Sequence, residues 1–249
     1  LIVDNTFATP ILCRPIEFCA DIVVHSTSKY MDGHACALGG VIVDSGNFDW
    51  AASGKFPEFT EPDESYHGVI YSKNFGNAAY ITKARVQLMR DMGAAPAPQN
   101  AFLLNLGLET LHLRMRAHSD NAKKIAEYLE SDERVSWVNY PGLESNKDHE
   151  LAKKYLPNGS SGVISFGVKG GRKAAIEFMD NLRVAAIVTH VADARTCALH
   201  PASTTHRQMT DEELKECGIG EDLIRFSVGI ENADDLIEDI KQALDKACK

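Results

Sequence analysis

The stretch that determines the fold is Asp21-Ile22-Val23-Val24-His25-Ser26-Thr27-Ser28-Lys29-Tyr30. It starts as a short apolar run rich in β-branched residues and ends in hydroxyl side chains gathered around Lys29. Two similar apolar runs, at residues 1–3 and 40–43, lie before and after it. Continuous apolar runs bounded by polar turns predict strands that are buried on both faces, as in the parallel or mixed sheets of α/β proteins.

Helical spacing follows a stretch that has no periodicity. Residues 51–75 are rich in Pro, Glu, Ser, Tyr and Gly, and they are predicted to form a long loop. Apolar residues then recur every three or four positions from Asn77 to Gly93, which predicts a helix. Prolines interrupt this pattern, and a second long helix is predicted to begin with Asn100 as its N-cap.

The prolines also mark a predicted domain boundary, which divides the chain into residues 1–98 and residues 99–249. Three segments of the second part alternate apolar and other residues with a period of two: residues 135–138, 162–168 and 224–229. This alternation predicts an antiparallel sheet with one exposed face. An apolar stripe over residues 236–247 predicts a final helix.

Charge and composition exclude several classes of function. The 249 residues contain 26 Lys and Arg against 35 Asp and Glu, and this net charge of −9 opposes binding to nucleic acid or anionic membranes. No apolar run approaches the roughly 20 residues of a membrane-spanning helix, and no secretory signal is recognised. The six cysteines form no CxxC pair. We therefore expect reduced thiols in a cytoplasmic protein, and no metal site.

Polar side chains at the predicted strand ends are candidates for chemistry. Asp4 closes the first apolar run, where a carboxylate needs a cation or a donor, unless it only forms a turn with Asn5. Ser26, Ser28 and Lys29 follow the second run, and the crevice outside strand ends is where α/β proteins bind ligands. A lysine amine, hydroxyl donors and a carboxylate match the needs of pyridoxal phosphate: a covalent attachment point, phosphate donors and a partner for the pyridine nitrogen.

Arg225 is a candidate for substrate binding. It lies in a predicted strand whose other face carries Ile224, Phe226, Val228 and Ile230. A planar guanidinium on the face opposite the core is suited to two-point binding of a substrate carboxylate. A solvated strand charge is the alternative interpretation.

Four segments together resemble, in order and spacing, the Cys/Met-metabolism family of pyridoxal-phosphate-dependent enzymes. They are Val3-Asp4-Asn5-Thr6-Phe7-Ala8-Thr9-Pro10, His25-Ser26-Thr27-Ser28-Lys29-Tyr30-Met31-Asp32-Gly33-His34, His200-Pro201-Ala202-Ser203-Thr204-Thr205-His206 and Arg225-Phe226-Ser227-Val228-Gly229-Ile230-Glu231. The resemblance covers essentially the whole chain. Residues 76–85 and 107–116 look most like those of O-acetylhomoserine sulfhydrylases.

The resemblance implies a type I pyridoxal-phosphate-dependent transferase fold. Residues 1–98 would form the end of the large mixed-sheet cofactor domain, and residues 99–249 a small α/β C-terminal domain. Within the family's site, Lys29 would bind the cofactor covalently and then move protons on the substrate. Asp4 would pair with the pyridine nitrogen, and Ser26 and Ser28 would donate to the phosphate. Arg225 would hold the substrate carboxylate.

The reaction implied by the resemblance is γ-replacement, in which O-acetyl-L-homoserine and sulfide give L-homocysteine and acetate. Other chemistries of the family stay open, namely those of a cystathionine γ-synthase and of a methionine or cystathionine γ-lyase. The resemblance also implies a homotetramer.

Two departures from the family's pattern bear on function. His190 stands where a small polar residue is usual, either beside the substrate carboxylate or as a satisfied structural histidine. The chain also starts without Met, inside an apolar run at Leu1, and lacks the family's N-terminal glycine loop, ring-stacking aromatic residue and arm with Tyr and Arg. We therefore expect the later part of a longer protein, with the remaining N-terminal portion as a partner. A non-catalytic fragment is the alternative from another functional class.

Overall fold

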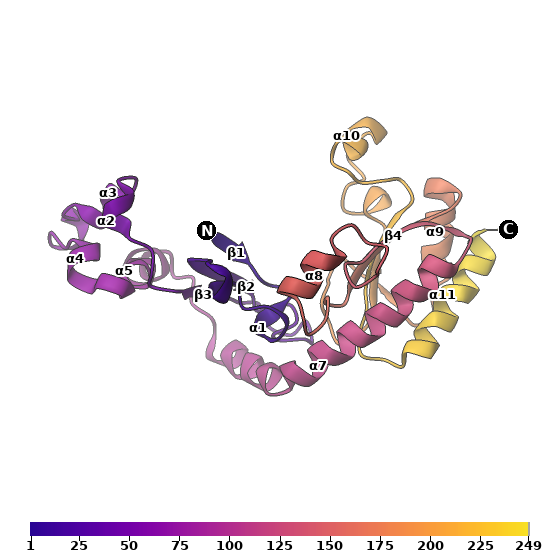
Figure 1. Ribbon diagram of the computed structural model, residues 1–249, viewed down its shortest axis with the longest axis horizontal. Coiled ribbons are helices and arrows are strands. Elements are labelled where there is room, and N and C mark those ends of the chain that lie inside the picture. Colours follow the sequence, from indigo (N-terminus) through magenta and orange to yellow (C-terminus); the bar gives the residue numbers. More distant parts are fainter. Residues whose placement is uncertain (249) are drawn as a thin grey trace.

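The computed structural model describes residues 1–248, which form two sheets connected by one long helix (Figure 1). The first sheet has the strand order β1-β2-β3. Its elements are β1 (Ile2–Asp4), α1 (Thr9–Leu12), the 3-10 helix η1 (Pro15–Phe18), β2 (Ile22–Ser26) and β3 (Gly40–Asp44). Strands β1 and β2 are parallel, whereas β3 is antiparallel to β2. All three predicted strands and the mixed sheet are therefore confirmed.

The expected burial of these strands is correct only for the central strand. Ile22 and Val23 of β2 are buried, but Ile2 of β1 is 62% exposed, and Val41 and Ile42 of β3 are 38% and 44% exposed. The prediction that all three runs are buried on both faces is therefore wrong for β1 and β3. Both are edge strands of a small sheet, and the packing of residues 1–248 leaves their apolar side chains partly in solvent.

Residues 51–75 contain short helices instead of the predicted long loop. These are α2 (Trp50–Ser53), α3 (Pro57–Thr60), the 3-10 helix η2 (Glu64–Tyr66) and α4 (Tyr71–Phe75). Aromatic packing holds them together: the Trp50 ring stacks on Phe59 with centroids 4.2 Å apart, and Tyr71 is fully buried. A helix of one turn has no periodicity to detect, which is why the sequence pattern missed them.

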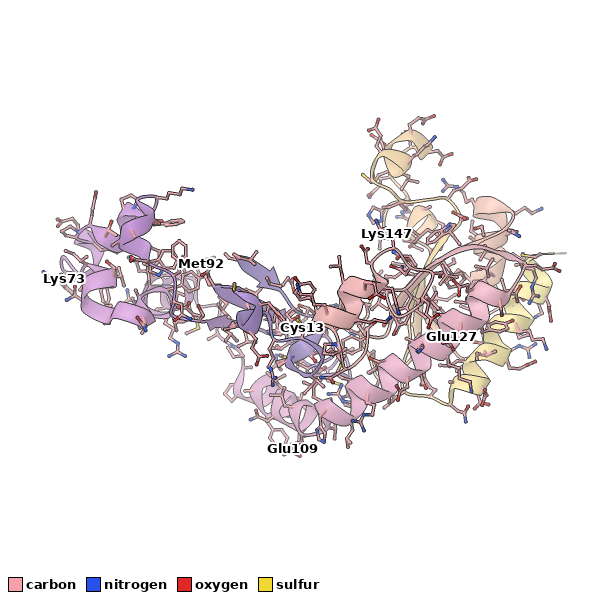
Figure 2. The ribbon with its side chains drawn as sticks, viewed as in Figure 1. Cys13, Lys73, Met92, Glu109, Glu127 and Lys147 are labelled. Carbon is pink, nitrogen blue, oxygen red and sulfur yellow. The ribbon has the colours of Figure 1, made fainter. Side chains whose placement is uncertain are left out.

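The predicted helix over residues 77–93 is confirmed, with an irregular centre. It consists of the 3-10 helix η3 (Gly76–Ala78), α5 (Ala79–Lys83), the π-helix η4 (Ala84–Met89) and α6 (Arg90–Met92). Gly93 ends it with φ +69°, a conformation that glycine adopts without strain. Leu88 and Met92 join Val24 and Ile42 around an open cavity of about 640 Å³. Figure 2 shows Met92 on the side of this helical region that faces the first sheet.

The long helix α7 (Pro98–Ser131) connects the two sheets. It begins three residues earlier than predicted: its N-cap is Ala97, so the assignment of Asn100 as N-cap is wrong. Pro98 explains the difference, because a proline in the first helical turn loses no hydrogen bond. At 1.5 Å per residue the helix is about 50 Å long. Figure 2 marks Glu109 and Glu127 along it, and the domain boundary placed at its start stays a prediction.

The second sheet has five strands in the order β4-β5-β8-β7-β6. They are β4 (Val135–Asn139), β5 (Val163–Val168), β6 (Ala186–Ile187), β7 (Cys197–Leu199) and β8 (Leu223–Ser227). The antiparallel pairs β4–β5 and β5–β8 confirm the predicted sheet, while the short strands β6 and β7, which pair in parallel, were not predicted. None of the helices described for residues 1–248 combines the length and apolar composition needed to span a bilayer.

The main core lies on one face of this sheet. The remaining helices are α8 (His149–Tyr155), α9 (Gly171–Asp180), the 3-10 helix η5 (Pro201–Ser203), α10 (Asp211–Glu216) and the predicted final helix α11 (Ala233–Ala247). Alternate residues of β5 and β8, such as Ile164, Phe166 and Phe226, are buried in one cluster with α7, α9 and α11. Figure 1 shows α7 and α11 side by side. The other face of β8 is thereby directed away from the core.

Candidate active site

Lys29 lies in a tight turn directly after β2. Its backbone N–H donates to the Ser26 carbonyl at 3.3 Å, and Gly33 N–H donates to the Lys29 carbonyl at 2.7 Å. Asp32 N–H closes the same turn by donating to the Thr27 carbonyl at 2.9 Å. The turn sets the half-buried Lys29 just beyond the end of β2, as the sequence predicted.

A small pocket of about 110 Å³ brings Lys29 together with Ser28 and His190. The residues 35–38 complete its wall. Ser28 Oγ accepts a hydrogen bond from Gly39 N–H at 3.0 Å and donates to the Gly39 carbonyl at 3.4 Å. The second of these bonds is long, so the hydroxyl can exchange it for a better acceptor. The pocket therefore offers one amine, one hydroxyl and one imidazole.

Hydrogen bonds between distant segments join the halves of the chain around this pocket. Ala194 N–H donates to the Gly33 carbonyl at 2.7 Å, and Gly162 N–H donates to the Tyr30 hydroxyl at 3.1 Å. Tyr30 is fully buried, and burial raises its pKa to about 12, so the phenol stays protonated. These contacts tie the turn that carries Lys29 to the segment that carries His190.

Asp4 and Ser26 lie at the neighbouring ends of the parallel strands β1 and β2. Thr6 links them: its hydroxyl donates to Asp4 Oδ1 at 2.6 Å and accepts from Ser26 N–H at 2.9 Å. The Thr6 hydroxyl and backbone N–H both donate to Asp4, and these bonds lower the pKa of the exposed carboxyl. Asp4 is therefore an oriented carboxylate at neutral pH.

Arg225 lies on the face of β8 that points away from the main core. Ile224 and Phe226 on either side of it are buried, as the alternation predicted, but Ile230 is 42% exposed because β8 ends at Ser227. The Arg225 side chain donates through Nη2 to the carbonyls of residues 189 and 190, at 2.9 and 3.0 Å. Burial lowers its pKa, although a guanidinium remains charged. Neither Arg225 nor Asp4 nor Ser26 lines the small pocket itself.

His190 is not a satisfied structural histidine. Its Nε2 atom is buried and has no hydrogen-bond partner among residues 1–248. The carboxylate oxygen Asp193 Oδ2 is 4.0 Å away. Burial, followed by the positive charge of Lys29, lowers the pKa of His190. The imidazole is therefore neutral at pH 7.

The residues of this region fit pyridoxal phosphate. Two buried nitrogens here, His190 Nε2 and Arg225 Nε, lack a hydrogen-bond partner among the described residues. His190 shares the pocket with Lys29 and Ser28, Arg225 contacts the carbonyl of residue 190, and Thr6 links the ionised Asp4 to Ser26 at the end of β2. An amine can attach to the aldehyde of the cofactor, hydroxyl groups can donate to its phosphate, and a carboxylate can pair with its pyridine nitrogen. A guanidinium can bind the carboxylate of an amino-acid substrate, and the imidazole is a further polar group beside them.

Sequence reasoning missed two residues of this region. Thr6 carries the link between Asp4 and Ser26, and a hydroxyl two residues after an aspartate is a recognisable turn signal. Gly39 is the second: a Cβ there would lie 2.6 Å from Thr27 Oγ1. Its role depends on the close approach of two segments, which no local pattern reports.

Comparisons with known proteins agree with this geometry. A family model described as Cys/Met metabolism PLP-dependent enzyme matches residues 1–245. Homocysteine synthase of Schizosaccharomyces pombe is 51% identical over 99% of this chain and 58% of its own length. O-acetyl-L-homoserine sulfhydrylase of Leptospira meyeri is 46% identical over 98% of this chain and 57% of its own length. The chain thus spans somewhat more than half the length of these relatives.

A solved structure is similar over almost the whole chain. It is described as an O-acetylhomoserine (thiol)-lyase of Campylobacter jejuni with N'-pyridoxyl-lysine-5'-monophosphate, and it aligns with a TM-score of 0.91 at 41% identity. The match covers 98% of this chain and 58% of that one. With the family model matching residues 1–245, the chain belongs to the Cys/Met-metabolism family of pyridoxal-phosphate-dependent enzymes.

Proposed function

We propose that the protein catalyses γ-replacement, in which O-acetyl-L-homoserine and sulfide give L-homocysteine and acetate. The observation that carries the proposal is the pocket in which Lys29, Ser28 and His190 meet beyond the end of β2. The names of the relatives, homocysteine synthase and O-acetyl-L-homoserine sulfhydrylase, support this pair of substrates.

Each site residue has a proposed role. Pyridoxal phosphate, when bound, supplies an electron sink for carbanions at the substrate's α and β carbons, which no side chain provides. Lys29 Nζ is the proposed attachment point, and as a free amine it accepts and returns protons at these carbons. Asp4 holds a proton on the pyridine nitrogen, because its lowered pKa keeps it anionic. Ser26 and Ser28 donate to the phosphate.

Arg225 is proposed to hold the substrate carboxylate, which fixes the α carbon relative to Lys29. The bond between Cγ and the acetate oxygen breaks, and a bond between Cγ and sulfur forms. The acetyl group leaves as acetate, and the protons of hydrogen sulfide go to solvent and to the product thiol. The reaction therefore needs no oxidant or reductant.

The proposal also covers the domain boundary, the oligomeric state and the cellular location of the protein. We propose the domain boundary between residues 98 and 99, a homotetramer, and a cytoplasmic protein. Exposed apolar side chains such as Leu88 (62%) and Met92 (77%) support association. The six cysteines are free thiols, which supports a reducing compartment. Light scattering tests the assembly: a mass of four protomers is expected, and a monomer at micromolar concentration would refute it.

Covalent capture of the cofactor tests the role of Lys29. Protein of native length is incubated with pyridoxal phosphate, reduced with borohydride, digested and analysed by mass spectrometry. The pyridoxyl group is expected on Lys29. A Lys29→Gln variant serves as the negative control, and Lys55→Gln, at an exposed lysine outside the pocket, as the matched control that keeps the label. Wild-type protein without a label at Lys29 would refute the catalytic assignment and favour the non-catalytic interpretation.

Product analysis tests the reaction. O-acetyl-L-homoserine is supplied with sulfide, with cysteine, or with no thiol. Homocysteine in the first mixture is the expected result. Cystathionine as the main product with cysteine would indicate a cystathionine γ-synthase, and 2-oxobutyrate without a thiol would indicate a lyase.

A further inference from the structure

We propose that Arg114 is a positioning residue for Lys29: its buried guanidinium holds the two carbonyls that follow the lysine and thereby fixes the turn that carries it. Arg114 lies on α7 and does not line the pocket, so it acts through the backbone of the turn. The inference deepens the proposed function, because it rests on the role proposed for Lys29.

Arg114 makes hydrogen bonds both to the turn after β2 and within its own helix. Its Nη1 donates to the Tyr30 carbonyl at 2.7 Å, and its Nη2 donates to the Met31 carbonyl at 3.3 Å. Within α7, Nη2 also donates to the Gly107 carbonyl at 2.6 Å, and Nε donates to Thr110 Oγ1 at 3.1 Å. The guanidinium therefore bridges the helix and the turn.

These contacts continue the hydrogen bonds that close the turn itself. Gly33 N–H donates to the Lys29 carbonyl at 2.7 Å, and Arg114 binds the next two carbonyls along the chain. Three successive carbonyls are thus occupied, beginning at the lysine. A peptide unit whose carbonyl is held cannot rotate without losing that hydrogen bond. The direction in which the Lys29 side chain leaves the backbone is therefore fixed.

A buried guanidinium without a carboxylate partner is energetically costly. Arg114 is only 5% exposed, and none of the ion pairs among residues 1–248 involves it. An apolar side chain of similar length would cover the same surface without removing a charge from water. What the arginine adds is a planar set of donors that reaches two turn carbonyls at once. Its particular contribution is therefore to the turn.

The helix packs closely against the turn and supports this contact. Met115, the next residue of α7, is fully buried in the same cluster as Tyr30 and Met31. The close approach requires Gly107, because a Cβ there would lie 2.6 Å from the carbonyl oxygen of Asp32. The Asp32 carboxylate in turn accepts from backbone N–H groups of the segment that forms the pocket wall. A fixed turn therefore also fixes the wall.

Hydrogen exchange of protein of native length, without added cofactor, tests the contact by mass spectrometry of overlapping peptides. Arg114→Lys keeps the charge but loses the planar set of donors. Gly107→Ala keeps the arginine but places a methyl group against the turn. Arg116→Lys, at an exposed position of α7, is the matched control. Arg134→Lys is the control for lost stability, because Arg134 binds Asp132 at a place outside the pocket.

We expect Arg114→Lys and Gly107→Ala to speed exchange at the amides of residues 32 and 33 at least tenfold relative to those of β8, because these two N–H groups close the turn. Both control variants should keep this ratio within twofold of wild type, even where Arg134→Lys lowers the midpoint of urea unfolding. An unchanged ratio in both test variants would overturn the proposal. So would an equal rise in the turn and in β8, which indicates a general loss of stability.

Kinetics separate this role from substrate binding. With saturating sulfide, Arg114→Lys should lower kcat at least tenfold and leave KM for O-acetyl-L-homoserine within twofold, because Arg225 is unchanged. Covalent capture of pyridoxal phosphate at Lys29 should become at least fivefold slower. A raised KM with wild-type kcat, or capture at the wild-type rate, would overturn the proposal. Wild-type protein that captures no cofactor would instead contradict the proposed function, and the exchange result would still decide whether Arg114 holds the turn.

Discussion

The Thr6 hydroxyl donates a hydrogen bond to Asp4 Oδ1 at 2.6 Å and accepts one from Ser26 N–H at 2.9 Å. This relay orients the carboxylate at the end of β1 toward the end of β2, and it lowers the pKa of Asp4. Thr6, which orients the Asp4 carboxylate, carries no charge itself. Its contribution can be measured without changing the net charge of the site.

Thr6→Val should weaken binding of pyridoxal phosphate about 5- to 10-fold, which corresponds to the loss of one hydrogen bond of roughly 1–1.5 kcal/mol. The pKa of Asp4 should rise toward its ordinary value, because its largest stabilising contact is lost. Fluorescence titration measures the affinity, and a carbon NMR titration measures the pKa. Thr6→Ser keeps the hydroxyl and should bind like wild type; an unchanged affinity in Thr6→Val would contradict the relay.

Arg225→Lys should raise KM for O-acetyl-L-homoserine about 10- to 100-fold, because an ammonium cannot bind a carboxylate through two parallel hydrogen bonds. The lysine can still reach one of the carbonyls that now accept from Nη2, so we expect the protein to fold. Steady-state kinetics with saturating sulfide measure the change. Arg116→Lys, on the exposed side of α7, is the control. A KM near the wild-type value would remove Arg225 from the carboxylate site.

The sequence was sufficient to predict the local features of this site. The strand β2 and the turn with Lys29 follow from an apolar run and the polar residues directly after it. The meeting of Lys29 with His190 was beyond local patterns, because it depends on contacts such as Ala194 with Gly33 between distant segments. Competing local signals also made the predicted start of α7 wrong. The helix begins at Pro98, two positions before Asn100, which had been predicted as its N-cap.

The same distinction applies to the aromatic cluster and to the exposed strands. Trp50 and Phe59 stabilise one-turn helices through ring stacking, which leaves no periodic signal in the sequence. The apolar run of β3 predicts a strand correctly, but the burial of Val41 depends on which elements cover the sheet edge. Whether a segment forms a strand depends on its local sequence, whereas the burial of its side chains depends on how all the elements pack together.

His118 should make stability depend on pH. It is fully buried, and its Nδ1–H donates to the Val228 carbonyl at 2.8 Å. Burial lowers its pKa from 6.5 to about 4, so the unfolded chain binds a proton between these values and the folded chain does not. The stability conferred by the neutral imidazole is therefore complete above pH 6.5 and is lost as the pH falls toward 4. At pH 5 the loss is about 2 kcal/mol.

Urea unfolding at pH 7.5 and pH 5 measures this effect. Asn in place of His118 can still donate to the Val228 carbonyl, but it does not titrate. His118→Asn should be less stable than wild type at pH 7.5 because its side chain is smaller. Its further loss at pH 5 should be about 2 kcal/mol smaller than that of wild type. His112→Asn, at an exposed position of the same helix, should follow wild type at both pH values. Parallel pH profiles of wild type and His118→Asn would exclude His118 as the source.

Two alanines with positive φ provide a matched test of backbone strain near the pocket. Ala35 has φ +55° and is exposed, whereas Ala192 has φ +65° and is fully buried. A left-handed conformation costs a residue with a Cβ about 1–2 kcal/mol. Glycine avoids this cost, but it lowers the free energy of unfolding by about 0.5–1 kcal/mol because the unfolded chain becomes more flexible. Ala35→Gly should therefore stabilise the protein by about 0.5–1 kcal/mol.

Ala192→Gly relieves similar strain but also removes a buried methyl group, which contributes about 0.8 kcal/mol. Its net effect should be close to zero. Ala51→Gly, in α2, relieves no strain and should destabilise by about 0.5–1 kcal/mol. Chemical denaturation of the three variants measures the order Ala35→Gly, Ala192→Gly, Ala51→Gly from most to least stable. If Ala35→Gly were as unstable as Ala51→Gly, the turn beside Lys29 would carry no strain, since the two exposed alanines differ chiefly in their φ angle.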